Sequence, residues 1–189
     1  MHLQFSLPAK LGLIYLVSEV ALRFMRRSDA HSKRRDGNSL LGLWLAIGLG
    51  MGGAIAVAYT LPAFSFPLPT SVAQFVGTLF ACGLILRWWA ILSLGKFFTV
   101  DVAILPDHEL IVRGPYHVLR HPSYSGMMLA FVMLSVTFQN WLSIVCLMLP
   151  VSIALAYRIY IEEIALEATF GDAYHTYSKA TKRLIPGVF

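Results

Sequence analysis

The stretch LLGLWLAIGLGMGGAIAVAYTL, residues 40–61, contains no charged side chain. A helix needs about 20 consecutive, mostly apolar residues to cross the hydrocarbon core of a bilayer, and this stretch has that length. Its apolar residues follow one another without the alternation that is typical of a half-buried strand. Within lipid, helices and closed barrels are the structures that satisfy every backbone hydrogen bond. The stretch therefore predicts a membrane-spanning helix.

The rest of the chain has the same apolar character. Of its 189 residues, 57% are hydrophobic and 13% are charged, whereas about 25% charged residues are typical of soluble domains. The five expected spans cover residues 7–22, 40–61, 72–94, 124–138 and 141–160, and the turn Gln139-Asn140 joins the last two. We therefore expect an all-α, polytopic membrane protein with about five spans, a C-terminal helical hairpin and a cytoplasmic tail.

Basic side chains gather between the first two expected spans. They are Arg23, Arg26, Arg27, Lys33, Arg34 and Arg35, in a chain of net charge +5. Such a patch is also typical of nucleic-acid binding, but between spans an excess of Lys and Arg indicates a cytoplasmic loop. We therefore expect the N-terminus, the Pro-rich loop 62–69 and the turn 139–140 outside, with segment 95–122 and the tail inside. The membrane would be a bacterial inner membrane or the endoplasmic reticulum.

Two ionisable residues lie within the expected spans, where an unpaired charge is costly. Glu19, in the first span, is expected to pair with a basic residue or to reach the interface. Arg87 stands next to Trp88 and Trp89 near one end of the third span. A long side chain flanked by aromatic residues is expected to extend toward the membrane surface. A place for Arg87 in the wall of a site is the alternative.

Small residues in the spans predict close packing rather than chemistry. In the second span, Gly48-x-x-x-Gly52, with Gly50 and Gly53 nearby, permits close approach of another helix. Packing within the protein is expected, and a dimer face is the alternative. The cysteines, Cys82 and Cys146, lie inside expected spans without the spacing of a metal site, so we expect buried apolar side chains and no metal.

Segment 113–126, RGPYHVLRHPSYSG, concentrates two histidines, two arginines and two tyrosines. Pro122 suits the first turn of the fourth span and keeps His121 out of helical geometry. His121 is therefore expected at the helix entrance, beside backbone N–H groups that suit an anionic ligand. An interfacial loop that binds lipid phosphates is the alternative.

Acidic residues follow the fifth span at its cytoplasmic end. Arg158 and Glu162 lie four residues apart and share a helix face, whereas Glu163 points to another side. An intrahelical ion pair is one interpretation of Arg158 and Glu162. The hairpin also brings the cytoplasmic ends of its two helices together. Segment 113–126 and the two glutamates are therefore expected to form one site, which suits a zwitterionic or mixed-charge cofactor.

Several motifs occur in order in the C-terminal half. They are LGKFFT (94–99), GPY (114–116), RHPSYSG (120–126), Arg158-x-x-x-Glu162-Glu163, FGDAY (170–174) and RLIP (183–186). As an ordered set over residues 87–189, they resemble the isoprenylcysteine carboxyl methyltransferase family. In its short length the chain is similar to the compact prokaryotic members. Related phospholipid methyltransferases carry Gly-x-Gly ahead of their glutamate pair, where this chain has Gly114-Pro-Tyr116.

The resemblance implies a site for S-adenosylmethionine that uses no Rossmann domain. The cofactor-binding residues that it implies are Gly114, Tyr116, His117, Arg120, His121, Tyr124, Glu162 and Glu163. The implied catalytic residues are Arg158, near the substrate carboxylate, and Glu162. Residues 71–189 would form the catalytic membrane core. Residues 1–70, two helices and the basic loop, would belong to the same structural unit.

The residue types agree with methyl transfer to a carboxylate. A carboxylate is ionised at pH 7 and needs no general base. An arginine can orient it with two hydrogen bonds, while acidic side chains hold the cofactor's amino group and Arg120 or His121 its carboxylate. We expect a lipophilic or prenylated, isoprenylcysteine-like substrate, S-adenosylhomocysteine as product, lipid surroundings and no nucleic acid. A phospholipid N-methyltransferase, an NADPH-dependent sterol-reductase-like enzyme and a non-catalytic membrane protein are the alternatives.

Overall fold

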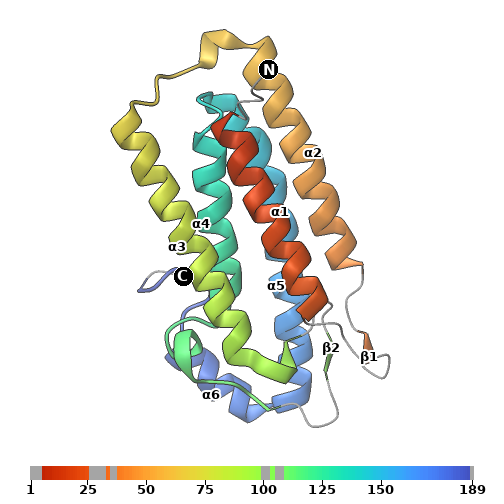
Figure 1. Ribbon diagram of the computed structural model, residues 1–189. Helices are drawn as coiled ribbons and strands as arrows, with labels where there is room; N and C mark the ends of the chain where they lie inside the picture. Colours follow the sequence, from red (N-terminus) through yellow and green to blue (C-terminus); the bar gives the residue numbers. More distant parts are fainter. Residues whose placement is uncertain (1–5, 26–32, 35–37, 99–102, 105–108, 188–189) are drawn as a thin grey trace.

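Five long helices form a bundle, and a short sixth helix crosses one end of it (Figure 1). The computed structural model describes residues 6–25, 33–34, 38–98, 103–104 and 109–187. The α-helices are α1 (Leu7–Met25), α2 (Ser39–Thr60), α3 (Thr70–Leu94), α4 (Pro122–Val136), α5 (Trp141–Phe170) and α6 (Asp172–Ala180). The connections hold the 3-10 helices η1 (Pro62–Phe64), η2 (Gly95–Phe97) and η3 (Gly114–His117), and the strands β1 (Lys33–Arg34) and β2 (Ala103–Ile104). The expected helical fold is confirmed.

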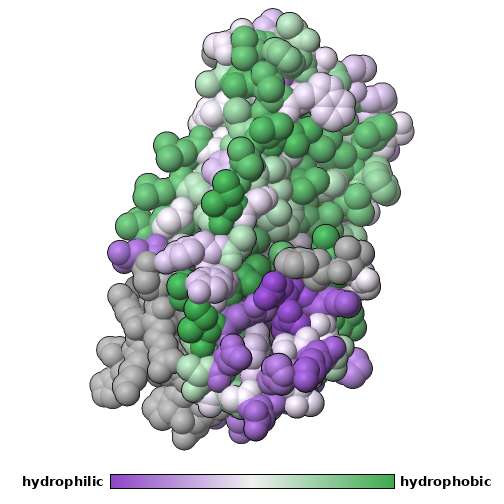
Figure 2. All heavy atoms as spheres, turned by 180° about the vertical axis from the view of Figure 1, so that it is seen from behind, coloured by the Kyte–Doolittle hydropathy of each residue, from purple (hydrophilic) through white to green (hydrophobic). Residues whose placement is uncertain are grey.

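Among the described residues, three helical segments are long and apolar enough to cross a membrane. They are Ser39–Thr60, Thr70–Phe97 and Trp141–Phe170. Helix α1 carries Lys10 and Glu19, and α4 has 15 residues. All five expected spans are therefore helical, while a crossing by α1 and α4 stays a prediction. The surface agrees with a membrane protein: on the face that Figure 2 shows, apolar side chains cover most of the bundle, and strongly polar ones gather near the α6 end.

One end of the bundle is closed by the turn before α5. The side-chain Oδ1 of Asn140 accepts hydrogen bonds from the backbone N–H groups of Leu142 at 3.0 Å and Ser143 at 3.3 Å, which caps the helix. Its Nδ2 donates to the Leu61 carbonyl oxygen at 2.9 Å. The Phe66 N–H donates to the carbonyl oxygen of Gln139, also at 2.9 Å. The Pro-rich loop and this turn therefore lie at the same end, as predicted.

The other loops meet at the opposite end (Figure 1). Strand β1, from the loop between α1 and α2, pairs antiparallel with β2, from the segment after α3. The backbone N–H groups of Arg120 and His121 donate to the carbonyl oxygens of Lys182 at 2.7 Å and Arg183 at 3.0 Å. The relative placement of the loops is thus confirmed. Of the basic loop and the LGKFFT motif, Arg26, Arg27, Arg35 and Thr99 lie outside the described residues.

Glycines allow close contact at two helix crossings. A Cβ atom at Gly83 would lie 2.7 Å from the Gly126 carbonyl oxygen, and one at Gly126 would lie 2.5 Å from that of Gly83. Helices α3 and α4 therefore touch backbone to backbone. Gly50 plays this part between α2 and α5, where a Cβ would lie 3.1 Å from an α5 carbonyl oxygen. Gly48 and Gly52 have nothing within 4 Å, so the predicted packing of Gly48-x-x-x-Gly52 within the protein is wrong: helical periodicity turns Gly50 inward.

The different surroundings of Gly126 and Gly52 predict opposite effects for two Gly→Ala substitutions. Gly126→Ala should destabilise the protein by about 1–3 kcal/mol, because overpacking forces the two backbones apart. Gly52→Ala should be neutral or stabilising by up to about 1 kcal/mol, because alanine favours the helix and meets no neighbour. Thermal unfolding in detergent measures both. Equal melting temperatures for the two variants would contradict the close α3–α4 contact.

Candidate functional site

A buried ion pair connects α1 to α3. Arg87 donates from Nε to Glu19 Oε1 at 2.6 Å and from Nη2 to Oε2 at 2.9 Å. Its Nη1 donates to the Ser123 hydroxyl at 3.0 Å. Arg87 is 8% exposed, so the expectation that it extends to the membrane surface is wrong, because the carboxylate holds its charge inside the bundle. The expected pairing of Glu19 with a basic residue is confirmed.

Arg158 contacts α4 and α2 from α5. It is 4% exposed; its Nε donates to the Tyr124 hydroxyl at 2.9 Å and its Nη1 to the Ser39 hydroxyl at 3.0 Å. Arg158 therefore contacts two other helices, so an intrahelical pair with Glu162 alone does not describe its surroundings. We call the set Glu19, Ser39, Arg87, Ser123, Tyr124 and Arg158 the buried polar layer. Each of the five long helices contributes to it.

A pocket adjoins the buried polar layer. It is lined by Tyr15, Glu19, Leu22, Leu40, Leu43, Trp44, Ile47, Arg87, Phe98, Ser123, Tyr124, Met127 and Arg158. Its cavity volume is about 60 Å³, whereas one water needs about 10–15 Å³. Most of its apolar side chains come from α1 and α2, and its charged groups are Glu19, Arg87 and Arg158, from α1, α3 and α5. Such a lining suits an amphiphilic ligand with a polar head and an apolar body.

Glu163, on α5, collects donors from segment 113–126 and from the C-terminal segment. It accepts hydrogen bonds from Arg120 Nε at 3.1 Å and from Arg183 Nε at 3.1 Å, and Arg183 Nη2 lies 2.8 Å away. His121 Nε2 lies 3.3 Å from the same carboxylate. The hydrogen bond to Glu163 raises the pKa of Arg183. Glu163 thus joins segment 113–126, α5 and the C-terminal segment.

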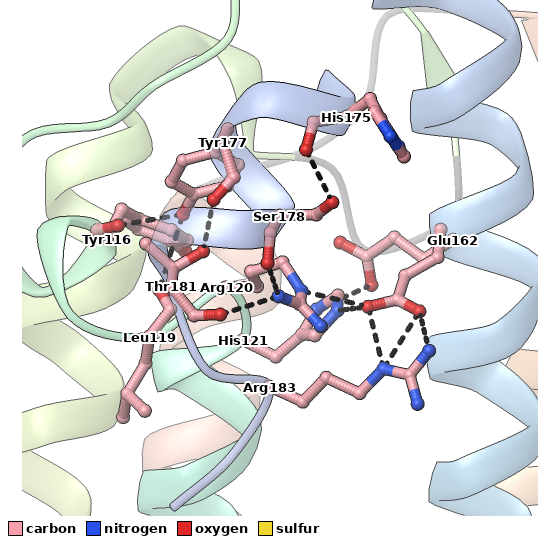
Figure 3. A network of polar contacts seen from close by, with 11 residues as sticks. Tyr116, Leu119, Arg120, His121, Glu162, His175, Tyr177, Ser178, Thr181 and Arg183 are labelled. Carbon is pink, nitrogen blue, oxygen red and sulfur yellow. Dashed lines mark hydrogen bonds and ion pairs between the residues drawn. The ribbon is translucent and has the colours of Figure 1, made fainter. Parts of the chain in front are cut away.

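The C-terminal segment folds over segment 113–126 through further hydrogen bonds. Arg120 Nη1 donates to the carbonyl oxygens of Ser178 at 2.6 Å and Thr181 at 2.7 Å. The Tyr177 hydroxyl donates to the Tyr116 carbonyl oxygen at 2.8 Å. Burial raises the pKa of Tyr177 to about 12, so it donates as a neutral phenol. Helix α6 therefore closes the end of the site (Figure 3).

Glu162 is placed differently from its neighbour. Its Oε2 atom is buried without a hydrogen-bond partner among the described residues, 3.9 Å from His121 Nδ1. The buried hydroxyl of Tyr174 also has no partner among them. Burial raises the pKa of Tyr174, Glu163 and Glu162 raise it further, and Arg120 lowers it. Orphaned buried polar atoms are rare in native structures, so these two are candidates for binding a polar ligand.

His121 links the two parts of the site. As predicted, it stands at the entrance of α4, but its ring lies between Glu162 and Glu163 instead of capping the helix. The anionic groups beside the His121 ring are thus the chain's own carboxylates, while an anionic ligand at the backbone N–H groups of the helix entrance stays a prediction. The ring stacks on Tyr124 with centroids 5.7 Å apart. Since Tyr124 contacts Arg158, the stack leads from the glutamates to the pocket.

The remaining predicted residues lie around this centre. Tyr116 is buried; burial raises its pKa, and the charge of Glu162 adds to the effect. Gly114 has φ +62°, a conformation that favours glycine, and a Cβ there would lie 3.0 Å from the Ser93 hydroxyl of α3. His117 is exposed. The structure therefore brings Arg120, His121, Glu162 and Glu163 together, with Tyr116 near Glu162, whereas Gly114 packs on α3 and His117 faces outward.

Residues 75–168 match the sequence model of the Isoprenylcysteine carboxyl methyltransferase (ICMT) family. The chain belongs to this family. The family region contains Arg87, segment 113–126, Arg158 and both glutamates, but it excludes α1, α2 and the C-terminal segment. The parts that complete the pocket and the Glu163 contacts thus lie on either side of it.

Relatives agree with this family assignment. Protein-S-isoprenylcysteine O-methyltransferase B of Arabidopsis thaliana is 34% identical over 119 residues, which are 62% of this chain and 60% of the plant protein. Uncharacterized protein YpbQ of Bacillus subtilis (strain 168) is 29% identical over 83 residues, 44% of this chain and 49% of that protein. The chain therefore spans about half to three fifths of these relatives' length.

A solved structure has the same fold. It is that of the eukaryotic intramembrane Ras methyltransferase ICMT, which matches with a TM-score of 0.68 and 21% sequence identity. The match covers 98% of this chain and 70% of that one. At this identity the likeness shows the fold, and it includes α1 and α2, which the family model omits.

Some residues of this methyltransferase-family site were not predicted. Tyr174 and Arg183 stand in the FGDAY and RLIP motifs, and Tyr177 follows Tyr174 by three residues, which places both on one helix face. These spacings could have indicated them. Ser39 had no such signal, because a small neutral residue at a helix start is commonplace. Its role depends on which helix lies opposite.

Proposed function

We propose that this protein is an integral-membrane methyltransferase that transfers the methyl group of S-adenosylmethionine to the carboxylate of a lipophilic, isoprenylcysteine-like acceptor. One observation carries the proposal: a buried carboxylate oxygen of Glu162 lies 3.9 Å from His121 Nδ1, the His121 ring stacks on Tyr124, and the Tyr124 hydroxyl accepts a hydrogen bond from the buried Arg158 guanidinium. Glu162 suits a cationic amine, and Arg158 suits an anionic carboxylate. Family membership and the names of relatives support this choice.

The residues around Glu162 fit the polar end of the cofactor. The orphaned Oε2 could accept a hydrogen bond from the amino group, and the neutral Tyr174 hydroxyl could donate one to the carboxylate. Segment 113–126, with Tyr116, Arg120 and His121, would form a wall of this part of the site. Arg120, His121 and Glu163 already bind one another, so we assign them to holding the wall and Glu162 to the ligand.

Arg158 fits the acceptor's head group. Its hydrogen bonds to Tyr124 and Ser39 go to neutral hydroxyls, and a carboxylate is a stronger acceptor that also matches the guanidinium fork. Leu43, Ile47 and Met127 line the same pocket and suit an apolar tail. The tail would thus remain among helices while its head meets Arg158.

The chemistry asks little of the protein beyond placement. When bound, S-adenosylmethionine supplies an electrophilic methyl group. The acceptor carboxylate is ionised at neutral pH, so Arg158 orients a ready nucleophile. Bringing the partners together and excluding water are the contributions expected from the site. Tyr124, between His121 and Arg158, would keep the two halves in register.

The decisive experiment compares ligands and products of the purified protein in detergent. S-adenosylhomocysteine should raise the melting temperature by mass action, and NADPH should leave it unchanged. With labelled cofactor and a prenylated cysteine acceptor, the product should release labelled methanol in base, as an ester does. Stabilisation by NADPH alone would favour a reductase, and a base-stable label on nitrogen would favour an N-methyltransferase.

Three substitutions divide the roles along α5. Glu162→Gln should weaken S-adenosylhomocysteine binding by about 1.5–3 kcal/mol, the scale of a hydrogen bond to a charged group. Arg158→Lys keeps the charge but loses the fork, so turnover should fall while that affinity is kept. Glu163→Gln should mainly lower the melting temperature, because Arg120 and Arg183 lose the negative charge with which they pair. Calorimetry, kinetics and thermal unfolding measure the three; equal loss of affinity in all would contradict this division.

We also propose that α1 to α5 cross the membrane together, with the N-terminus outside and the site facing the cytoplasm. The basic loop before α2 and the positive charges near α6 support this orientation. Single cysteines at Ser65 and Asp172, exposed at opposite ends, test it in sealed vesicles, with Cys82 and Cys146 replaced. An impermeant thiol reagent should label position 65 from outside and position 172 from inside. The reverse pattern would overturn the orientation.

A further inference from the structure

Helix α1 takes part in the pocket although it lies outside the family region. Tyr15, Glu19 and Leu22 face the cavity from α1. Two polar contacts hold this helix against α3: the fork from Arg87 to Glu19, and a hydrogen bond of 2.7 Å from Trp88 Nε1 to the Ser18 hydroxyl. The first lines the pocket and the second does not. Both contacts can attach α1 to α3, but only the Glu19–Arg87 contact can also shape the pocket. Variants of each contact therefore distinguish the two effects.

Stability alone is a weak reason for a buried ion pair. Replacing such a pair with apolar residues of similar size is often neutral or stabilising, because desolvation offsets the attraction. Apolar contacts also hold α1, since Tyr15 packs on Phe131 with ring centroids 4.7 Å apart. The Glu19–Arg87 pair, at the wall of the pocket, therefore points to a task beyond joining two helices.

The pair is also connected to the acceptor-binding arginine. Arg87 donates to the Ser123 hydroxyl at 3.0 Å, and the next residue, Tyr124, accepts from Arg158. Each nitrogen of the Arg87 guanidinium already donates to Glu19 or Ser123. A substrate carboxylate would have to displace the carboxylate of Glu19 from it. Arg87 is thus suited to hold other groups in place rather than to bind substrate.

We propose that the Glu19–Arg87 ion pair is a positioning device for the acceptor. It holds α1 as one wall of the pocket, and through Ser123 it fixes the first turn of α4, so that Tyr124 keeps the Arg158 guanidinium directed at the acceptor's head. The inference rests on the proposed function. It assigns selectivity for the acceptor's tail to a contact between α1 and the family region.

The test uses a double variant, Glu19→Leu with Arg87→Met, which leaves no buried charge unpaired. It should keep the melting temperature and the S-adenosylhomocysteine affinity of the wild type. Its KM for a prenylated cysteine acceptor should rise about tenfold, which corresponds to about 1.4 kcal/mol of lost binding, and its preference between long and short tails should weaken. Ser123→Ala, a milder change, should raise the acceptor KM several-fold with the same cofactor affinity.

The matched control is the double variant Ser18→Ala with Trp88→Phe, which removes the other polar link between α1 and α3. It should leave the acceptor KM and tail preference unchanged. Wild-type acceptor kinetics in the Glu19/Arg87 and Ser123 variants, or equal shifts in the control, would overturn the inference alone. A wild-type protein that binds no S-adenosylhomocysteine and methylates no acceptor would overturn the proposed function, and this inference with it.

Discussion

The cost of burying charge inside an apolar bundle is the constraint on which this structure depends. In lipid, apolar surfaces gain little from leaving one membrane helix for another, so packing and polar contacts decide how helices associate. Here Glu19 and Arg87 pair across α1 and α3, while Arg158 bonds hydroxyls of α4 and α2. Because every long helix supplies a partner, pairing these groups determines how the helices surround the pocket.

The adjacent glutamates of α5 have different surroundings because they point in different directions from the helix. Neighbouring residues point about 100° apart on a helix. Glu163 therefore faces Arg120, His121 and Arg183, and closes segment 113–126 against the C-terminal segment. Glu162 keeps a buried oxygen without a partner among the described residues. We therefore assign Glu163 to the wall of the site and the unpartnered oxygen of Glu162 to ligand binding.

The family region and the helices around it contribute different parts of the site. Residues 75–168 hold the arginine and glutamates to which we assign head-group and cofactor contacts. Much of the pocket's apolar wall comes from α1 and α2. Methyl transfer and tail selection would therefore rest on separate segments, connected through Arg87 and Ser123. Relatives could then keep the chemistry while changing the lipid they accept.

The sequence by itself determined the helical class, the positions of five helices, the ends at which the loops meet and four residues that gather at the site: Arg120, His121, Glu162 and Glu163. Hydropathy and motif spacing are local, so they are readable along the chain. Tertiary structure alone decided that Gly50 rather than Gly48 packs inward, and that Arg87 meets Glu19, 68 residues away. It alone decided that Glu163 binds Arg120 and Arg183, whereas Glu162 keeps an oxygen without a partner among the described residues. These outcomes depend on how each helix is rotated against its neighbours, and that rotation follows from contacts between distant segments.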